Sequence, residues 1–393
     1  MKQKIIDTIV IGLGAMGSAA VFQLAKRGHT VMGFDQFSPP HDYGSSHGET
    51  RIIRQAIGEG EEYIPLALRS YELWRELERE SGHELLVITG GLILENQRSN
   101  ALMHGRRGFL ARTSQSAKRF GIRHEMLDSR DVRTRFPQFA VTDEIGYFEH
   151  ETGYLRPESC IRAQLDLGKK HGAILRTDEQ VLSVNPRQSR TGVVVKTSRA
   201  DYQADTLVIA AGSWLSRFLE PSYADRFKVY RQVMFWFKMQ DGMRDAMLPG
   251  RFPIFIWILD GDADNVFYGF PSLDGKTIKI ASEQFVETTT PEKVRREVTK
   301  EEKEFMYRRF LADRLPCVTN DCERAAGCLY TMTPDSDFVI DRHPAHPQII
   351  IASPCSGHGF KHSAAIGEVV ADLIIEGKSK IDIGSFGIKR FNE

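Results

Sequence analysis

The first candidate for chemistry is a glycine-rich motif near the start of the chain. Residues 12–17 read GLGAMG, so Gly12, Gly14 and Gly17 hold the spacing GxGxxG. The motif follows a β-branched run that predicts a buried strand over 5–11, and it opens a helix expected over 18–27. Such glycines permit a tight turn and let the backbone approach a pyrophosphate at the helix N-terminus. The motif predicts a dinucleotide site but does not separate FAD from NAD.

Asp35 supplies the acid that such a site needs. A second strand is expected over 31–35, which completes a β-α-β unit with Asp35 at its end. A carboxylate there can bind a pair of ribose hydroxyls and disfavours a 2′-phosphate. The alternative is a glycine-rich turn in an α/β domain that binds no nucleotide. The strand, the helix and the acid together argue against that alternative.

Two arginines could bind an anionic group of a substrate. Residues 50–54 read TRIIR. In extended chain Arg51 and Arg54 face opposite ways, whereas in a helical turn they share a side. Together they could clamp a carboxylate through charge-assisted hydrogen bonds. The alternative is a surface ion-pair pattern with Glu49, and the sequence leaves both open.

A second glycine-rich segment, GHGFK at 357–361, precedes a helix expected over 360–376. The small residues Gly357 and Gly359 leave the helix N-terminus open to an anion. The edge of a flavin becomes negative on reduction, so this terminus would stabilise a reduced flavin. The alternative is an ordinary helix cap with Lys361 in solvent.

The spacing of cysteines and carboxylates predicts no metal site. Cys317, Cys322 and Cys328 contain no CxxC pair, and no histidine lies among them, which argues against zinc. Residues 260–265 (DGDADN) resemble the start of a calcium loop but lack its later glycine and glutamate, so they predict a hairpin turn. By its type alone, Cys328 is a small buried apolar residue.

The elements that must position these residues form two groups. β-α-β patterns lie at both ends of the chain, and residues 221–290 between them carry aromatic, alternating runs that predict an antiparallel sheet. Further strands are expected over 193–195, 206–210 and 349–352, and helices over 65–81 and 292–311, the last with Pro291 in its first turn.

The fold class is therefore α/β, with two discontinuous domains. Residues 1–86, 151–220 and 325–393 are predicted to form a Rossmann-like dinucleotide-binding domain. Residues 87–150 and 221–324 are predicted to form an α+β substrate domain built on the antiparallel sheet.

Composition excludes several classes of protein. Among 393 residues, 52 Lys and Arg balance 52 Asp and Glu, which argues against a nucleic-acid or membrane-surface partner. No run of about 20 apolar residues predicts a membrane span. Five cysteines, one of them Cys355, are too few and too odd in number for a disulfide framework, and they favour a reducing, cytoplasmic setting.

Together these motifs resemble the monomeric sarcosine oxidase and N-methyltryptophan oxidase family, FAD-dependent amine oxidases of the D-amino-acid-oxidase structural class. The resemblance extends along nearly the whole chain, and it implies a monomer with an FAD-binding domain. It is carried by GLGAMG at 12–17, HGETRIIR at 47–54, YIPLA at 63–67, YGFP at 268–271, CLYT at 328–331 and SGHGFK at 356–361.

The resemblance implies roles around the flavin. Cys328 matches the cysteine that carries FAD through a thioether, and Thr50 is expected beside the cofactor. Lys279 matches the lysine that promotes reaction of the flavin with dioxygen, and Arg51 matches the basic residue that supports it. The chemistry agrees, because superoxide that forms beside a flavin needs a fixed positive charge.

The resemblance also implies a substrate site. Arg54 and Lys361 match the pair that binds the substrate carboxylate, and Tyr268, Tyr330 and His358 match residues that line the pocket. The family members carry a histidine four residues beyond the lysine, whereas this chain has Glu283. That carboxylate could pair with Lys279, accept a cationic group of the substrate, or stay neutral and buried.

The implied reaction is oxidation of a secondary-amine amino acid to an imine, followed by oxidative demethylation, with dioxygen reduced to hydrogen peroxide. The expected partners are therefore a small amino-acid substrate and dioxygen. Alternatives are an oxidase of a cyclic imino acid such as proline or pipecolate, a flavin dehydrogenase with another acceptor, or a flavoprotein without turnover. An NAD dehydrogenase leaves Cys328 and His358 without a role.

Overall fold

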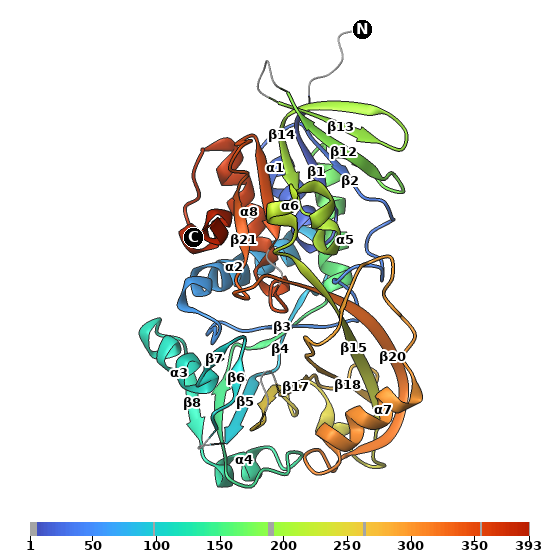
Figure 1. Cartoon of the computed structure of the whole chain (residues 1–393). Coiled ribbons are helices and arrows are strands. Elements are labelled where there is room, and N and C mark those ends of the chain that lie inside the picture. Colours follow the sequence, from blue (N-terminus) through green and yellow to red (C-terminus); the bar gives the residue numbers. More distant parts are fainter. Residues whose placement is uncertain (1–5, 97–98, 188–191, 262–264, 354–355, 393) are drawn as a thin grey trace.

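The computed structural model describes residues 6–96, 99–187, 192–261, 265–353 and 356–392, and two large sheets organise it (Figure 1). An eight-stranded sheet lies in the upper half of Figure 1, and a nine-stranded sheet lies in the lower half. The long strands β15 (Lys228–Met239) and β20 (Val318–Met332) pair side by side and extend from the lower sheet toward the upper half. Within the described residues, no helix has both the length and the apolar character needed to cross a membrane.

The eight-stranded sheet has a parallel centre, as the sequence predicts. β1 (Ile6–Ile11) pairs in parallel with β2 (Val31–Phe34) and with β14 (Asp201–Ile209). β11 (Ile174–Arg176) and β22 (Ile349–Ser353) extend the parallel set. β1, β2, β22 and the last three residues of β14 are almost wholly buried, which explains their apolar sequences. β12 (Val181–Pro186), β13 (Val193–Thr197) and β21 (Val339–Arg342) pair antiparallel.

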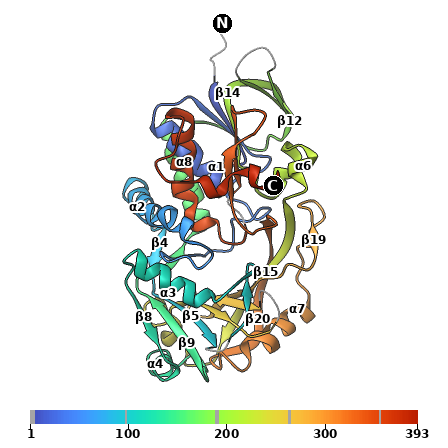
Figure 2. The same ribbon diagram turned by 60° about the vertical axis from the view of Figure 1, so that its left-hand side comes forward.

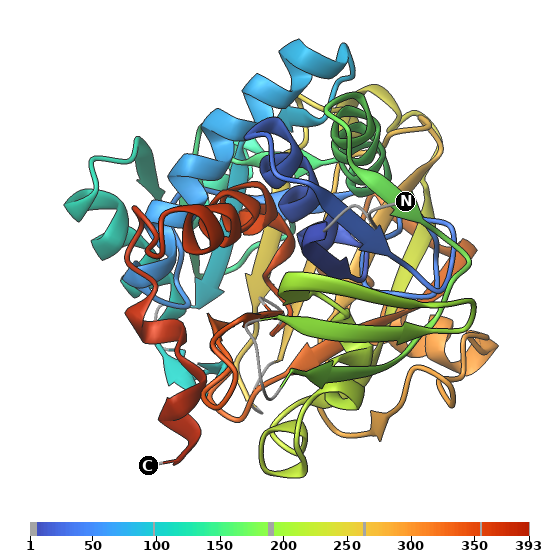
Figure 3. The ribbon, with the colours of Figure 1, turned by 90° about the horizontal axis from the view of Figure 1, so that it is seen from above.

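Four helices pack together on one side of this sheet (Figure 3). They are α1 (Ala15–Lys26), α2 (Ile64–Ser81), α5 (Pro157–Lys170) and α8 (Ser363–Ile375). α1 and α8 approach so closely that a Cβ on Gly367 would lie 2.5 Å from the backbone of Ala19. The chain enters α8 through a 3-10 turn, η5 (Phe360–His362), where the sequence predicts a continuous helix.

The nine-stranded sheet has the order β19-β15-β18-β17-β16-β5-β9-β8, with β20 on β15. Its other strands are β19 (Thr288–Thr289), β18 (Thr277–Ser282), β17 (Val266–Gly269), β16 (Ile254–Ile258), β5 (Gly91–Asn96), β9 (Glu144–Glu149) and β8 (His124–Leu127). The antiparallel prediction for residues 221–290 is confirmed, because β15, β18, β17 and β16 pair antiparallel. Beyond that range, β16 pairs in parallel with β5. β5 precedes the aromatic region by a long crossover, so a pattern over residues 221–290 alone could not include it.

The predicted helix over 292–311 is wrong in its first part. α7 spans only Lys300–Met306, and a π-helical turn, Tyr307–Leu311, follows it. The Thr299 side chain accepts a hydrogen bond from the Glu302 amide in a capping box, so Pro291 lies well before the first turn. Residues 291–293 form a turn and residues 294–299 are irregular. Arg231 on β15 donates a hydrogen bond of 2.8 Å to the Glu297 carbonyl and so holds this segment against the sheet.

Smaller elements join the two halves. β3 (Arg51–Ile53), β10 (Gly153–Leu155) and β4 (Leu86–Ile88) form a three-stranded antiparallel sheet between them. β6 (Leu102–Met103) and β7 (Arg106–Arg107) form a short hairpin, and α3 (Phe109–Arg119) lies against β5 (Figure 2). The remaining helices are α4 (Ser129–Arg135) and α6 (Pro221–Ala224).

The boundaries of the two domains stay a prediction. β20 crosses the expected boundary at residue 325.

The predicted hairpin turn over 260–265 joins β16 to β17. These two strands pair antiparallel, as a hairpin requires, although residues 262–264 lie outside the described part of the chain.

Candidate functional site

Two cavities share part of their walls. The first, of about 170 Å³, lies at the carboxyl ends of β1 and β14, and the second, of about 80 Å³, lies against β17 and β18. Both are lined by Arg51, Tyr330, Gly357 and Phe360. The carboxyl edge of a parallel sheet is where nucleotides bind in folds of this kind.

The first cavity is shaped by the glycine turn. Gly12 has φ +86°, and a Cβ on it would lie 2.5 Å from the Ala210 carbonyl oxygen. A Cβ on Gly17 would lie 1.7 Å from the Gly12 oxygen, so Gly17 packs beneath the turn and does not line the cavity. Gly14 does line it, and a Cβ there would meet nothing within 4 Å. Gly12 and Gly17 therefore form the turn, and Gly14, which has no side chain, leaves the adjoining part of the cavity open.

The polar groups of this cavity fit a dinucleotide. Gly14 is the N-cap of α1 and provides no side-chain cap, so the first helix amides can bind an anion. Asp35 lines the cavity and accepts hydrogen bonds of 2.9 Å from the amides of Leu13 and Phe37. These bonds fix its carboxylate beside the turn, where a ribose is expected. Gly357 and Gly359 line the same cavity.

The second cavity contains every residue that the sequence assigns to catalysis or to substrate binding. Its walls include Arg51, Arg54, Tyr268, Lys279, Glu283, Tyr330, His358 and Lys361, together with Thr50. Five different parts of the chain supply them, namely β3 and the segment after it, β17, β18 and the segment after it, β20, and the segment before α8. The structure therefore brings together residues that the sequence could relate only through a resemblance.

Two tyrosines close one side of the second cavity. The hydroxyl oxygens of Tyr268 and Tyr330 lie 3.1 Å apart. Burial raises the pKa of Tyr268 to about 12 and raises that of Tyr330 well above its ordinary value. Both side chains are therefore neutral phenols at physiological pH.

Lys279 is buried and fully hydrogen-bonded. Its Nζ donates to the Gly48 carbonyl at 2.7 Å, to the Thr50 carbonyl at 2.8 Å and to Thr50 Oγ1 at 3.0 Å. Burial lowers the pKa of Lys279 well below its ordinary value, and the charge of Arg51 lowers it further. Three acceptors match the three protons of an ammonium group and favour the charged form.

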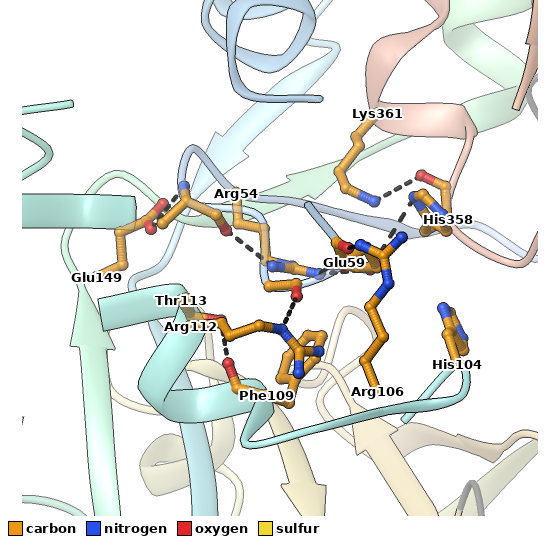
Figure 4. A network of polar contacts seen from close by, with 12 residues as sticks. Arg54, Glu59, His104, Arg106, Phe109, Arg112, Thr113, Glu149, His358 and Lys361 are labelled. Carbon is orange, nitrogen blue, oxygen red and sulfur yellow. Dashed lines mark hydrogen bonds and ion pairs between the residues drawn. The ribbon is translucent and has the colours of Figure 1, made fainter. Parts of the chain in front are cut away.

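Arg54 already has a carboxylate partner, which no pattern in the sequence indicates (Figure 4). Its guanidinium donates to both oxygens of the buried Glu59, at 2.7 Å to Oε1, and to the Ala56 carbonyl at 2.8 Å. Burial favours a higher pKa for Glu59, but the surrounding positive charges, that of Arg54 foremost, together outweigh it and hold that pKa well below its ordinary value. The alternative in which Arg51 and Arg54 form surface ion pairs with Glu49 is wrong, because Glu49 instead pairs with Arg324 at 2.6 Å.

Lys361 and His358 lie next to this ion pair. Lys361 is 4% exposed, so the alternative that it lies in solvent is wrong. Its Nζ donates to the His358 carbonyl at 2.5 Å, and burial lowers the pKa of Lys361 to about 7. The His358 ring stacks on Phe338 with 4.6 Å between centroids, and burial lowers its pKa well below the ordinary value. His358 is therefore a neutral imidazole.

Glu283 is paired with a histidine that the sequence did not indicate. His104, at the tip of the β6–β7 hairpin, lies with Nε2 3.1 Å from Glu283 Oε2. Lys279 makes its hydrogen bonds elsewhere, so Glu283 is not its partner. Glu59, His104 and His358 each have a side-chain atom that could bind a metal ion, and these three atoms lie within 4.8 Å of one another. The cations of Arg54 and Lys361 line the same cavity and oppose a metal ion there.

Cys328 lies behind the wall between the cavities. It is 2% exposed, and its Sγ is 3.7 Å from the Ser45 carbonyl oxygen and 3.8 Å from Arg51 Nη2. Ser45 and Arg51 both line the first cavity, so the thiol lies directly behind the wall of that cavity. Cys160, Cys317, Cys322 and Cys328 are free thiols, and Cys355 lies outside the described residues.

The family model described as FAD dependent oxidoreductase (DAO) matches residues 7–373. The chain belongs to this family. It is 40% identical over 389 residues to the monomeric sarcosine oxidase of Streptomyces avermitilis, covering 98% of this chain and 97% of that protein. It is 33% identical to the N-methyl-L-tryptophan oxidase of Escherichia coli, covering 98% and 99%.

Solved structures confirm the fold of the family. NikD, an amino acid oxidase essential for nikkomycin biosynthesis, matches with a TM-score of 0.83 at 23% identity, covering 98% of both chains. The L-proline dehydrogenase of P. horikoshii matches with a TM-score of 0.81 at 22% identity, covering 99% and 98%. The α/β fold class predicted from the sequence is thus confirmed. The family is FAD-dependent, and the residues of the first cavity fit that dinucleotide.

Two glycines of the turn provide a matched test of this cavity. Gly17→Ala should lower the free energy of unfolding by about 1–3 kcal/mol or more, because its Cβ meets backbone. Gly14→Ala should leave the Tm of the flavin-free protein unchanged but hold less FAD, because its methyl group enters open cavity. Thermal unfolding and the flavin absorbance per protein check both. A Gly14→Ala variant with full flavin, or a Gly17→Ala variant as stable as wild type, would contradict this assignment.

Proposed function

We propose that this chain oxidises the CH–NH bond of a secondary-amine amino acid of the sarcosine or N-methyl amino acid type. The product is an imine, water then releases the primary amine and formaldehyde, and dioxygen is reduced to hydrogen peroxide. FAD, when bound, supplies the two-electron acceptor. The names of the relatives support the substrate class. The observation that carries the proposal is the charge of one group in the second cavity, namely Arg54, Glu59 and Lys361.

That charge matches one carboxylate. Arg54 and Lys361 are two cations and Glu59 is one anion, so the group has a single positive charge while Lys361 is protonated. Lys361 is buried, and a buried cation without a counter-charge is unstable. A substrate carboxylate that binds Lys361 beside the Arg54–Glu59 pair would neutralise the remaining positive charge. The neutral imidazole of His358 and the phenols of Tyr268 and Tyr330 add no charge to oppose it.

The other expected roles belong to the same proposal. Lys279, supported by Arg51, supplies positive charge for the dioxygen step, and Thr50 orients that ammonium. Glu283, with His104, is left to contact the amine side of the substrate. We also infer a monomer, as in the name of the Streptomyces avermitilis relative, and a reducing cytoplasmic setting from the free thiols.

The substrate class is tested by anaerobic bleaching of the flavin. N-methyl amino acids should bleach the absorbance of the holoenzyme, and admission of air should restore it with hydrogen peroxide formed. Methylamines without a carboxylate should bleach it at least tenfold more slowly, because they leave Lys361 unpaired. Bleaching by cyclic imino acids alone would favour the alternative substrate. Reduced enzyme that air does not reoxidise would favour a dehydrogenase.

We further propose that FAD is attached covalently through Cys328, whose thiol lies beside the first cavity. Acid precipitation should leave the yellow colour in the pellet of wild-type protein. It should release the colour from Cys328→Ser, which lacks the sulfur. Cys322→Ser on the same strand is the matched control and should behave as wild type. Colour that remains in the Cys328→Ser pellet would exclude this attachment site.

Carboxylate binding should weaken as the pH rises through 7. Lys361 is cationic below its pKa of about 7 and neutral above it, so its attraction for an anion is present at low pH and lost at high pH. The Kd of acetate, which has no amine to titrate and is ionised above about pH 6, should be constant from about pH 6 to 7 and rise up to about tenfold per unit above 7. Perturbation of the flavin spectrum measures this binding. Lys361→Met should bind acetate weakly at every pH, and an equal slope in that variant would disprove the role.

A further inference from the structure

Lys279 depends on a turn of three residues for all its hydrogen bonds. Gly48 has φ +94° and Glu49 has φ +70°, and the Thr50 amide donates to the Gly48 carbonyl at 2.8 Å. An i to i+2 hydrogen bond around a residue with positive φ defines a strained γ-turn, which is rare for a residue other than glycine. The turn persists only if its surroundings hold it.

Steric contacts fix the turn on one side. A Cβ on Gly48 would lie 2.6 Å from the sulfur of Met234 on β15, so the turn lies directly on the sheet. The side chain of Glu49 accepts a hydrogen bond of 3.0 Å from Trp236 Nε1 and pairs with Arg324 at 2.6 Å. These contacts fix the carboxylate of Glu49, but they do not involve the backbone amides of the turn.

Glu158 binds those amides. It lies in the first turn of α5, and its Oε1 accepts hydrogen bonds from the Gly48 amide at 2.6 Å and from the Glu49 amide at 3.2 Å. Hydrogen bonds to an ionised carboxylate are about twice as strong as those between neutral groups. One side chain therefore holds two consecutive amides, and the carbonyls on the other side of the same turn face Lys279.

Glu158 does not line the second cavity. It lines a separate space of about 320 Å³ that Lys279 also borders, on the side of α5. The negative charge of Glu158 also favours the protonated form of Lys279, against the effect of burial on its pKa. Glu158 can therefore act on Lys279 without touching the substrate.

We propose that Glu158 is a positioning residue for Lys279, because it holds the Gly48–Thr50 turn in the conformation that directs two carbonyls and one hydroxyl at the ammonium. The consequence for dioxygen rests on the function proposed above. The effect on the turn does not, so the two can be measured separately.

The first measurement is amide hydrogen exchange of the segment that contains residues 48–50, in the holoenzyme. Glu158→Ala should speed exchange there roughly tenfold to a hundredfold, the loss expected for hydrogen bonds to a charged group. Glu158→Gln retains an oxygen acceptor and should preserve much of the protection. Asp166→Ala, which removes an exposed carboxylate from the same helix, should leave the segment unchanged. Unchanged exchange in Glu158→Ala would overturn the proposal.

The second measurement separates the half-reactions in a stopped-flow instrument. Glu158→Ala should slow reoxidation of dithionite-reduced enzyme by roughly tenfold or more and leave flavin reduction by substrate within about twofold. Glu158→Gln should recover part of the rate. The double variant Glu158→Ala/Lys279→Met should be no slower than Lys279→Met alone, because Glu158 acts only through that ammonium.

The remaining outcomes overturn the proposal in distinguishable ways. Equal slowing of both half-reactions, or additive effects in the double variant, would show that Glu158 supports the fold and not Lys279. If Lys279→Met reoxidises at the wild-type rate, the role of Lys279 in the dioxygen step fails, and with it the consequence of Glu158 for that step, whereas the exchange measurement still decides whether Glu158 holds the turn. Bleaching by N-methyl amino acids in that same variant would still uphold the amine oxidation.

Discussion

The site depends on placing four basic side chains around a small cavity, three of them buried and Arg51 half-buried. Arg51, Arg54, Lys279 and Lys361 line the second cavity, and among the described residues two carboxylates, Glu59 and Glu283, line it with them. Removing an ion from water costs several kcal/mol unless other groups replace the water. The two sheets, the β3 segment and the turn before α8 therefore have to supply those groups from several parts of the chain.

Each cation is stabilised in a different way, and the difference explains what each can do. Lys279 is surrounded by backbone and hydroxyl oxygens, which hold a charge in place without neutralising it. Arg54 is neutralised by Glu59, so it is fixed before any substrate arrives. Lys361 has one carbonyl and a pKa near 7, so it is the cation whose charge an incoming anion can stabilise most.

The sequence predicts the parts of this arrangement that local motifs encode. The glycine turn, Asp35 and the central parallel strands follow from short patterns, and the residues of the second cavity follow from motifs in family order. Glu59, Glu158 and His104 were missed because their contacts are distant or depend on backbone conformation. Glu158 lies 110 residues from Gly48, and His104 lies 179 from Glu283. A lone acid in a helix or a histidine in a hairpin has no pattern that names such a partner.

The same limit applies to the fold. Residues 292–299 carry charges compatible with a helix, but hydrogen bonds from Arg231 and the cap at Thr299 place the helix start later. The capping box, threonine followed three residues later by glutamate, was present in the sequence and marks that start. The parallel pairing of β16 with β5 had no local signal, because it joins strands from distant parts of the chain.

Glu283 shows how a change at one position alters the charge of the whole cavity. The resemblance predicts a histidine there, and the chain instead places a carboxylate next to an imidazole that comes from the β6–β7 hairpin. A carboxylate within a cavity lined by four cations lowers the net positive charge, so Lys361 can stay protonated at a smaller cost. Glu283 and Glu59 together leave two of the four charges unbalanced. In the function proposed above, the reduced flavin edge and one substrate carboxylate would be the two anions that balance them.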